Sequence, residues 1–290
     1  MVKPSRSYRV FQGVNGVVLT LVVLVTLYPF VNIIARSFSG ERQIRAGEVT
    51  LLPKGFNPTT YEIVFQDSMF WRNYGNTVLY TVVATAVAMV LTTCYAYVLS
   101  KKHLKGRGLL VGIAVFTMFF TGGLIPNYVL VTNLGLKNTL WAIALPNAIS
   151  VFNLLVMKAF FESLPGELEE AAQIDGLSTY GILLRIVLPL SKAVVATMVL
   201  FYSVSFWNSW FSAFLYLDSS ELMPVTVYLR NLISGATTGG NAGAADAQLS
   251  QVGANIQAVT IVLTSLPILC VYPFVQRYFV SGVMLGAVKG

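Results

Sequence analysis

Charged side chains are scarce in this chain. Of its 290 residues only 11% are Asp, Glu, Lys or Arg, whereas 56% are hydrophobic, and the mean hydropathy is +0.70. Soluble domains carry roughly 25% charged residues. With so few charges the chain cannot cover a surface that faces water, and its hydrophobicity also excludes intrinsic disorder. The composition therefore predicts an integral membrane protein.

Cysteine and histidine are nearly absent, which excludes several kinds of site. Two cysteines cannot form a disulfide scaffold, and Cys94 and Cys270 lie in separate apolar stretches, where we interpret them as small hydrophobic residues. The single histidine, His103, lies in a basic loop, far from any cluster of metal ligands. Serine and threonine residues lack the His or Lys partner that nucleophilic catalysis needs. We therefore expect no metal site and no enzyme activity.

Motifs for nucleotide binding and ion coupling are missing as well. No G-x-x-x-x-G-K-[ST] segment occurs, so no phosphate-binding loop of that type is encoded. No ionisable residue lies deep inside an apolar run, which argues against a proton-coupled pump. If transport is active, we expect a partner protein to supply the energy, and we expect no cofactor in this chain.

Long charge-free runs dominate the sequence instead. Each is at least as long as the ~20 residues that a helix needs to cross a bilayer. After their polar ends are trimmed, they predict six helices near residues 13–35, 75–99, 108–132, 138–160, 191–216 and 256–278. The expected fold class is an all-α polytopic membrane protein with six transmembrane helices.

The distribution of positive charge predicts the orientation. The first run is too long for a secretory signal and has no cleavage site, so we expect it to remain as the first span. With both termini in the cytoplasm, 12 of the 19 Lys and Arg residues lie on the inner side, including the tight cluster between Lys101 and Arg107. The net charge of +7 then reflects topology and contact with anionic lipid. Nothing indicates nucleic acid binding.

The third and fifth runs contain polar residues where a transport path could form. In the third, Gly122, Gly123 and Pro126 interrupt the helix beside Asn127 and Tyr128. This pattern predicts either the polar lining of a solute path or a simple packing kink.

The fifth run ends in a segment rich in aromatic and amide side chains, which holds Tyr202, Trp207, Asn208 and Trp210. Aromatic rings stack on sugars and amides bind hydroxyl groups, so the segment suits a neutral polar solute. An aromatic belt at the membrane interface is the alternative.

A short acidic helix is predicted in the loop between the fourth and fifth runs. Pro165 suits a helix start, three glutamates follow it, and Asp175-Gly176 is a stop signal. About ten residues are marginal as a free helix, so we expect it to be held by docking. One face would present Leu168, Ala171, Ala172 and Asp175. Either another protein or the membrane surface would cover that face.

These residues resemble a known family. The EAA loop of ABC-importer permeases is matched by Glu170-Ala171-Ala172, by Gly176 after three more residues, and by Ile186, Val187 and Leu188-Pro189 after nine more. The neighbouring segment from Phe160 to Pro165 and Asp175 resemble the carbohydrate branch. The whole chain is similar to the second permease subunit of maltose-type and oligosaccharide importers.

The resemblance implies a type I ABC importer permease fold in a bacterial or archaeal cytoplasmic membrane. The implied partners are a second homologous permease subunit, two ATPase subunits that bind ATP and Mg, and an extracytoplasmic solute-binding protein. Carried over to this sequence, the residues that couple transport to the ATPase are Glu170, Ala171, Ala172, Asp175 and Gly176. The substrate would be a carbohydrate, most simply an oligosaccharide, moved by alternating access.

The expected organisation has three parts. Residues 1–70 hold the N-terminal tail, the first span and the first outer loop; residues 71–278 form the core permease domain with coupling loop 162–190; residues 279–290 form a cytoplasmic tail. The outer loop from Asp218 to Asn255 is implied to reach into the binding protein, or to act as a linker where it is Gly-rich. A stand-alone secondary carrier for a polar neutral solute is the alternative function.

Overall fold

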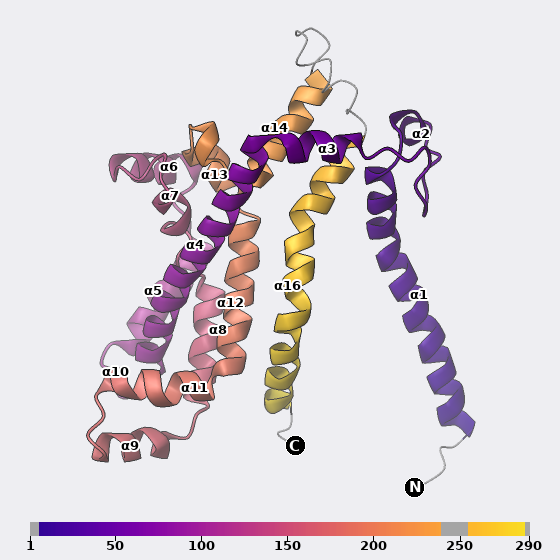
Figure 1. The fold of residues 1–290 in the computed structure, drawn as a ribbon. Coiled ribbons are helices and arrows are strands. Elements are labelled where there is room, and N and C mark those ends of the chain that lie inside the picture. The colour runs from indigo at the N-terminus through magenta and orange to yellow at the C-terminus, as the bar shows by residue number, and fades with distance from the viewer. Residues whose placement is uncertain (1–5, 239–254, 288–290) are drawn as a thin grey trace. The chain divides into compact units, whose positions relative to one another are not determined.

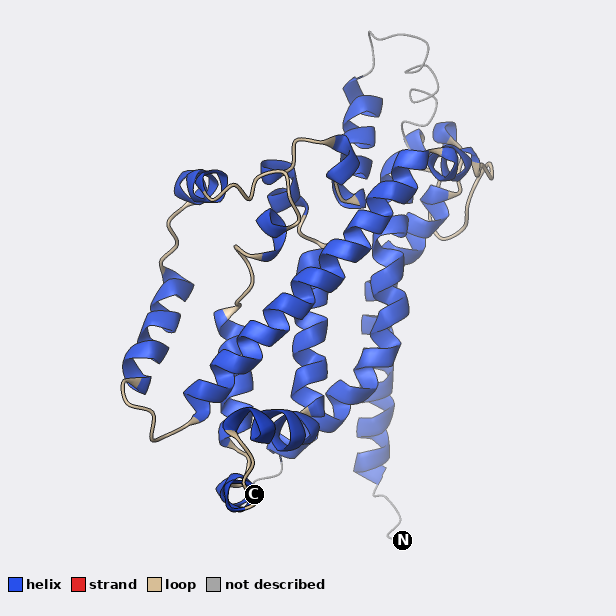
Figure 2. Cartoon of the chain, turned by 60° about the vertical axis from the view of Figure 1, so that its left-hand side comes forward, coloured by secondary structure: helices blue, strands red, loops and turns tan. Residues whose placement is uncertain are grey.

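Helices form the whole regular structure of the described residues in the computed structural model, which describes 6–238 and 255–287 (Figure 1). No strand occurs in these two ranges (Figure 2). The α-helices are α1 (Arg6–Ser37), α2 (Glu41–Arg45), α3 (Thr59–Gln66), α4 (Ser68–Ser100), α5 (Arg107–Phe119), α6 (Leu124–Asn133), α7 (Trp141–Ala144), α8 (Val151–Glu162), α9 (Gly166–Ile174), α10 (Thr179–Ile182), α11 (Leu188–Leu190), α12 (Lys192–Trp207), α13 (Trp210–Tyr216), α14 (Val225–Thr238) and α16 (Ile256–Ala287). A π-helical turn spans Leu183–Val187 and a 3₁₀ turn spans Ser220–Leu222.

The chain divides into two compact units. The first contains Met1–Ser68 and Leu229–Leu266, and the second contains Met69–Tyr228 and Pro267–Gly290. In the first unit, Asn255 joins separate segments at the start of α16. Its Oδ1 accepts a hydrogen bond from Thr60 Oγ1 at 2.6 Å, and its Nδ2 donates to the Ser39 carbonyl at 3.5 Å. These bonds tie α16 to α3 and to the turn after α1.

Small and hydroxylated side chains form the buried face of α4 in the second unit. The buried positions recur every three or four residues, which is the repeat of one helix face. They include Asn73, Thr77, Tyr80, Ala84, Ala88, Thr92 and Ala96. Small residues on a helix face let neighbouring backbones approach closely. The second long apolar run of the sequence therefore forms a helix, α4, that packs against its neighbours through one face of small and hydroxylated side chains.

The described start of the predicted outer loop is packed on α4. Thr77 Oγ1 accepts a hydrogen bond from Val225 N at 2.8 Å, and Tyr80 Oη donates to the Leu222 carbonyl at 2.7 Å. The loop then continues as helix α14 to Thr238. Most of the predicted Gly-rich segment, 239–247, lies outside the described residues.

Three of the six predicted spans are interrupted. The third bends by 114° between α5 and α6, where Gly123 has a φ of +87°. Pro126 lies in the first turn of α6, where a backbone N–H would have no partner within the helix, so the proline costs no hydrogen bond. The fourth is broken between α7 and α8, around Pro146, and the fifth between α12 and α13. Glycine and proline placed where backbone bonds end explain the first two breaks.

By length and hydropathy, two helices of the described ranges could cross a membrane, Ser7–Ser37 and Ser68–Ser100. Each of two bent pairs, α5 with α6 and 179–190 with α12, could count as one more span. The number of six transmembrane helices thus stays a prediction. Helix α16 runs on to Ala287, so helical structure extends past residue 278, where we expected the last span to end.

Candidate functional site

Helix α9 is the predicted acidic helix, and its two ends fit the sequence signals. Pro165 precedes its first residue, and Glu167 and Glu169 lie in the first turn, where the helix dipole favours negative charge. At its end, Leu177 N donates to the Ala172 carbonyl and Gly176 N to the Gln173 carbonyl, both at 3.0 Å. This pair of bonds is a Schellman motif, and Gly176 has the left-handed φ of +81° that the motif requires.

The faces of α9 differ from the predicted arrangement. Ala172 is buried in the apolar cluster of its own chain, while Leu168, Ala171 and Asp175 are exposed. The four residues therefore do not form one docking face, because the small Ala172 is what lets α9 approach its own bundle. Leu164 and Leu177, on either side of α9, pack against the same cluster. The short helix is held by its own chain at both ends.

The outward surface of α9 carries acidic and apolar side chains together. Glu170 is exposed, and Ile174, one turn later on the same side, is 87% exposed. Ile174 and Glu170 thus lie together on the side of α9 that faces away from its own bundle. Sequence reasoning missed Ile174, although its spacing of four from Glu170 contained the signal. Figure 1 places α9 at one end of the second unit, beyond α10 and α11.

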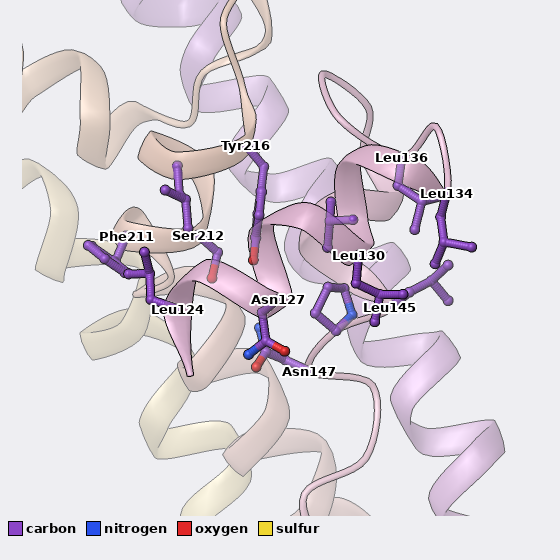
Figure 3. A pocket seen from close by; sticks show the side chains of 13 residues that line it. Leu124, Asn127, Leu130, Leu134, Leu136, Leu145, Asn147, Phe211, Ser212 and Tyr216 are labelled. Atoms are coloured by element: carbon purple, nitrogen blue, oxygen red, sulfur yellow. The ribbon is translucent and has the colours of Figure 1, made fainter. Parts of the chain in front are cut away.

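A pocket of about 490 Å³ lies at the helix breaks of the second unit (Figure 3). Asn127 of α6 and Asn147 of the α7–α8 break both line it, as do Ser212 and Tyr216 of α13. Leucines cover most of the remaining wall. Two amides and two hydroxyl groups on an apolar wall are the donor set that orients a polar ligand. Asn147, Ser212 and Tyr216 were not predicted, although Asn147 directly follows Pro146.

Asn147 also borders a second pocket of about 700 Å³. The polar side chains of that pocket are Ser150, Asn153 and Ser205, and Tyr202 contributes its ring. Pro146 and Asn147 line both pockets, so the α7–α8 break borders both cavities.

Tyr202 is a structural junction at the edge of the second pocket. The residue is only 2% exposed. Its hydroxyl lies 2.6 Å from Thr92 Oγ1 of α4 and accepts the Ser150 N–H at 2.9 Å. It thereby connects α12, α4 and the start of α8 through two hydrogen bonds, so the hydroxyl is already engaged.

The other predicted path residues are dispersed. Trp207 is buried and meets the Tyr74 ring edge-on, 5.9 Å between centroids. Asn208 is exposed, and its Nδ2 donates to the Val204 carbonyl at 2.8 Å, which caps the end of α12. Trp210 lies partly exposed beside Phe211 on α13. Of the predicted path residues, only Asn127 lines the first pocket and only Tyr202 the second; Trp207 borders a third, mostly apolar one.

Tyr128 belongs to a polar clasp beside the first pocket. Its ring stacks on Tyr216, 6.1 Å between centroids. A hydrogen bond to Tyr128 and another to Asp218 raise the pKa of Lys137 above its ordinary 10.5. Asn138, with φ of +59°, donates its N–H to the Tyr216 carbonyl at 2.8 Å and accepts from Asp218 N at 3.1 Å. The clasp thus joins the loop after α6 to the end of α13.

Comparison with known proteins gives consistent matches over the full chain. Residues 106–285 match the family described as binding-protein-dependent transport system inner membrane component. The chain is 43% identical over 288 residues to Protein LplC of Bacillus subtilis, covering 99% of this chain and 97% of that protein. It is 39% identical over 279 residues to the polygalacturonan/rhamnogalacturonan transport system permease protein YtcP of the same organism, covering 94% of this chain and 96% of that protein.

A solved structure has the same fold. One chain in the crystal structure of a bacterial ABC transporter involved in the import of the acidic polysaccharide alginate superimposes with a TM-score of 0.84. The two sequences are 35% identical, and the match covers 96% of this chain and 100% of the other.

Proposed function

We propose a transport function from one premise: the chain belongs to the family of binding-protein-dependent transport system inner membrane components. It is a membrane permease, and it carries a carbohydrate inward as a subunit of an ATP-driven importer. The resemblance of residues 170–189 to the EAA loop agrees with this family. Alternating access moves the substrate, and the energy comes from a separate ATPase, since this chain has no phosphate-binding loop of the G-x-x-x-x-G-K-[ST] type.

The observation that carries the ATPase contact within this proposal is the outward surface of α9. A nine-residue helix that is fixed to its own bundle through Ala172 presents Glu170 and an 87% exposed Ile174 to the outside. A carboxylate for a cation and an apolar side chain for a recess fit a protein surface better than water. We propose that an ATPase subunit covers this surface, with Glu170, Ala171 and Ile174 in contact and Gly176 ending the helix.

The remaining assembly follows the family. A second permease subunit would complete the membrane pore, two ATPase subunits would lie on the cytoplasmic side, and an extracytoplasmic binding protein would deliver the sugar. The excess of Lys and Arg on the inner side supports cytoplasmic termini, and the six charge-free runs of the sequence support six spans in the cytoplasmic membrane. α1 supports contact with lipid, since it is apolar and its side chains are exposed along most of its length.

We infer that the substrate is an oligosaccharide that contains uronate residues. A relative named for polygalacturonan and rhamnogalacturonan transport and a structural match involved in alginate import both handle acidic polymers. The pocket residues Asn127, Asn147 and Ser212 supply donors for sugar hydroxyl and carboxylate groups, and none of the residues around this pocket carries an acidic charge. An acidic sugar therefore meets no repulsion there.

The direct test is reconstitution. The complex of this chain with its partner permease and ATPases is placed in proteoliposomes with the binding protein, and uptake of oligogalacturonate is compared with that of a neutral maltooligosaccharide. We expect ATP-dependent uptake of the oligogalacturonate alone. Uptake by this chain without the ATPase would instead support the secondary carrier.

The pocket is tested by adding a negative charge to it. Asn127→Asp places a carboxylate where an acidic sugar would pass, whereas Asn133→Asp adds the same charge to an exposed position of α6 outside the pocket. We expect about tenfold slower oligogalacturonate uptake for Asn127→Asp, because like charges a few ångströms apart cost over ~1 kcal/mol even near a surface. Equal rates for the two variants would remove the pocket from the path.

A further inference from the structure

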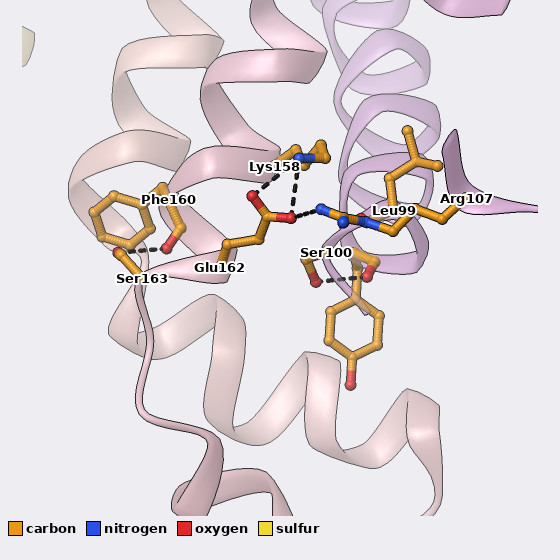
Figure 4. Close-up of polar contacts among 8 residues, drawn as sticks. Leu99, Ser100, Arg107, Lys158, Phe160, Glu162 and Ser163 are labelled. Atoms are coloured by element: carbon orange, nitrogen blue, oxygen red, sulfur yellow. Dashed lines mark hydrogen bonds and ion pairs between the residues drawn. The ribbon is translucent and has the colours of Figure 1, made fainter. Parts of the chain in front are cut away.

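Two partly buried ion-pair clusters lie at the end of the second unit near α9. In the first, Glu162, the last residue of α8, lies between two cations (Figure 4). Lys158 Nζ lies 2.9 Å from both of its carboxylate oxygens, and Arg107 pairs with it from the start of α5. Arg107 Nε also donates to the Leu99 carbonyl of α4 at 2.7 Å. One carboxylate thus connects α8 to α5, and through Arg107 to α4.

In the second cluster, Lys101 joins α4 to α9. Its ammonium group pairs with Glu169 in the first turn of α9. The same ammonium lies over the Tyr97 ring, 3.9 Å from the centroid. Lys101 directly follows the last residue of α4, so this contact connects α9 to the end of the longest helix of the second unit. Lys101 and Arg107 are the two ends of one short loop.

The ion pairs of these two clusters are more buried than the exposed ion pairs on the surface of the chain. The side chains of Lys101 and Glu169 are 19% and 22% exposed, whereas those of Arg72 and Glu221 are 53% and 60% exposed. Exposed pairs contribute little and are screened by salt. A pair that is mostly removed from water holds its two helices in a defined geometry, and loss of one partner leaves an uncompensated charge.

We propose that Lys101 is a positioning residue that transmits displacement of α9 to α4, with the Glu162 cluster fixing the other end of the loop. The proposal rests on the proposed function, in which an ATPase moves α9. Nine residues before Lys101, α4 carries Thr92, and the hydroxyl of Tyr202 connects Thr92 to Ser150 at the second pocket. A rigid helix of about two and a half turns therefore links Glu169 to the cavity.

Charge reversal tests the proposal in the complete importer. The variants are Lys101→Glu, Glu169→Lys and the double variant with both changes, reconstituted with the partner permease, the ATPases and the binding protein. The quantity measured is the number of oligogalacturonate molecules taken up per ATP hydrolysed. We expect each single reversal to lower this ratio about tenfold, within the usual range for coupling between sites, and the double variant to recover most of the loss.

Two controls separate transmission from folding. Lys105→Glu makes the same charge change at an exposed position of the same loop and should leave the ratio unchanged. Glu169→Gln keeps the size of the side chain and removes its charge. If the reversed variants do not assemble, uptake per ATP is measured with Glu169→Gln instead. The proposal would be overturned if Glu169→Gln kept the wild-type uptake per ATP. It would also be overturned if the single reversals kept that ratio despite lower thermal stability, or if the double variant had a ratio no higher than the singles.

The outcome is independent of substrate identity. If wild-type importer takes up no oligogalacturonate, the proposed substrate is wrong, and the ratio is measured with whichever saccharide the binding protein delivers. If wild type transports and the single reversals match Lys105→Glu, only the role of Lys101 is wrong.

Discussion

Gly176 allows the sharpest test of α9, because its replacement costs conformational energy alone. Its φ of +81° is left-handed, and a Cβ added there would meet no atom within 4 Å. A non-glycine residue in this conformation costs about 1–2 kcal/mol, and a β-branched one more. Since 1.4 kcal/mol is about a factor of ten in an equilibrium, Gly176→Val should make fraying of the last turn of α9 at least about ten times more frequent.

The expected result is a graded series. Asparagine tolerates the left-handed region, so Gly176→Asn should stay near wild type, Gly176→Ala should lose part of the coupling, and Gly176→Val most of it, with insertion into the membrane preserved. The assay is sugar uptake per ATP in proteoliposomes, together with the thermal unfolding temperature. Gly166→Ala is the matched control, because a Cβ there also meets no atom within 4 Å and its φ is not left-handed.

The series can refute the reasoning in two ways. Normal uptake per ATP in Gly176→Val would show that the turn plays no part in coupling. Equal losses for Gly176→Asn and Gly176→Val would show that conformation is not the cause, since only the valine is strained by the left-handed φ.

Three further substitutions address single contacts. Glu170→Ala removes an exposed carboxylate from α9 and should lower co-purification of the ATPase subunits; undiminished yield would contradict its contact role. Tyr202→Phe should lower the free energy of unfolding by about 1–3 kcal/mol, because the Ser150 N–H loses its acceptor; unchanged thermal unfolding would rule this out. Asn208→Leu should lower the unfolding temperature, because α12 loses its cap, and leave uptake and ATPase assembly unchanged, since Asn208 lines none of the three pockets; slower uptake would return Asn208 to the solute path.

Local signals in the sequence predicted α9 well. Pro165, the glutamates and Asp175-Gly176 gave its ends, because caps depend on the backbone preferences of single residues. The predicted docking face of α9 was wrong, because Ala172, which was assigned to it, packs against its own bundle. Which side of a short helix is buried depends on its tertiary contacts, here those of Ala172 with its own bundle, and helical periodicity contains no information about them.

The pocket residues show a similar limit. The break at Gly122-Gly123 could be predicted, because glycine and proline weaken a helix wherever they occur. That Asn127 would share a pocket with Asn147 and Ser212 could not be predicted, since the three lie on segments brought together only by folding. The cluster of Tyr202, Trp207 and Trp210 looked like one surface in sequence, but helical rotation and the break after α12 direct these rings to different places.

The exposed Ile174 has a consequence for how cells must make this protein. In the proposed importer, Ile174 is covered by the ATPase, so its apolar side chain would stay exposed to water on any copy without a bound ATPase. Copies of the chain without a bound ATPase would therefore bind unrelated proteins through this side chain or be degraded by proteases. Synthesis of the subunits at the same time and in matched amounts would avoid this loss of unassembled chains.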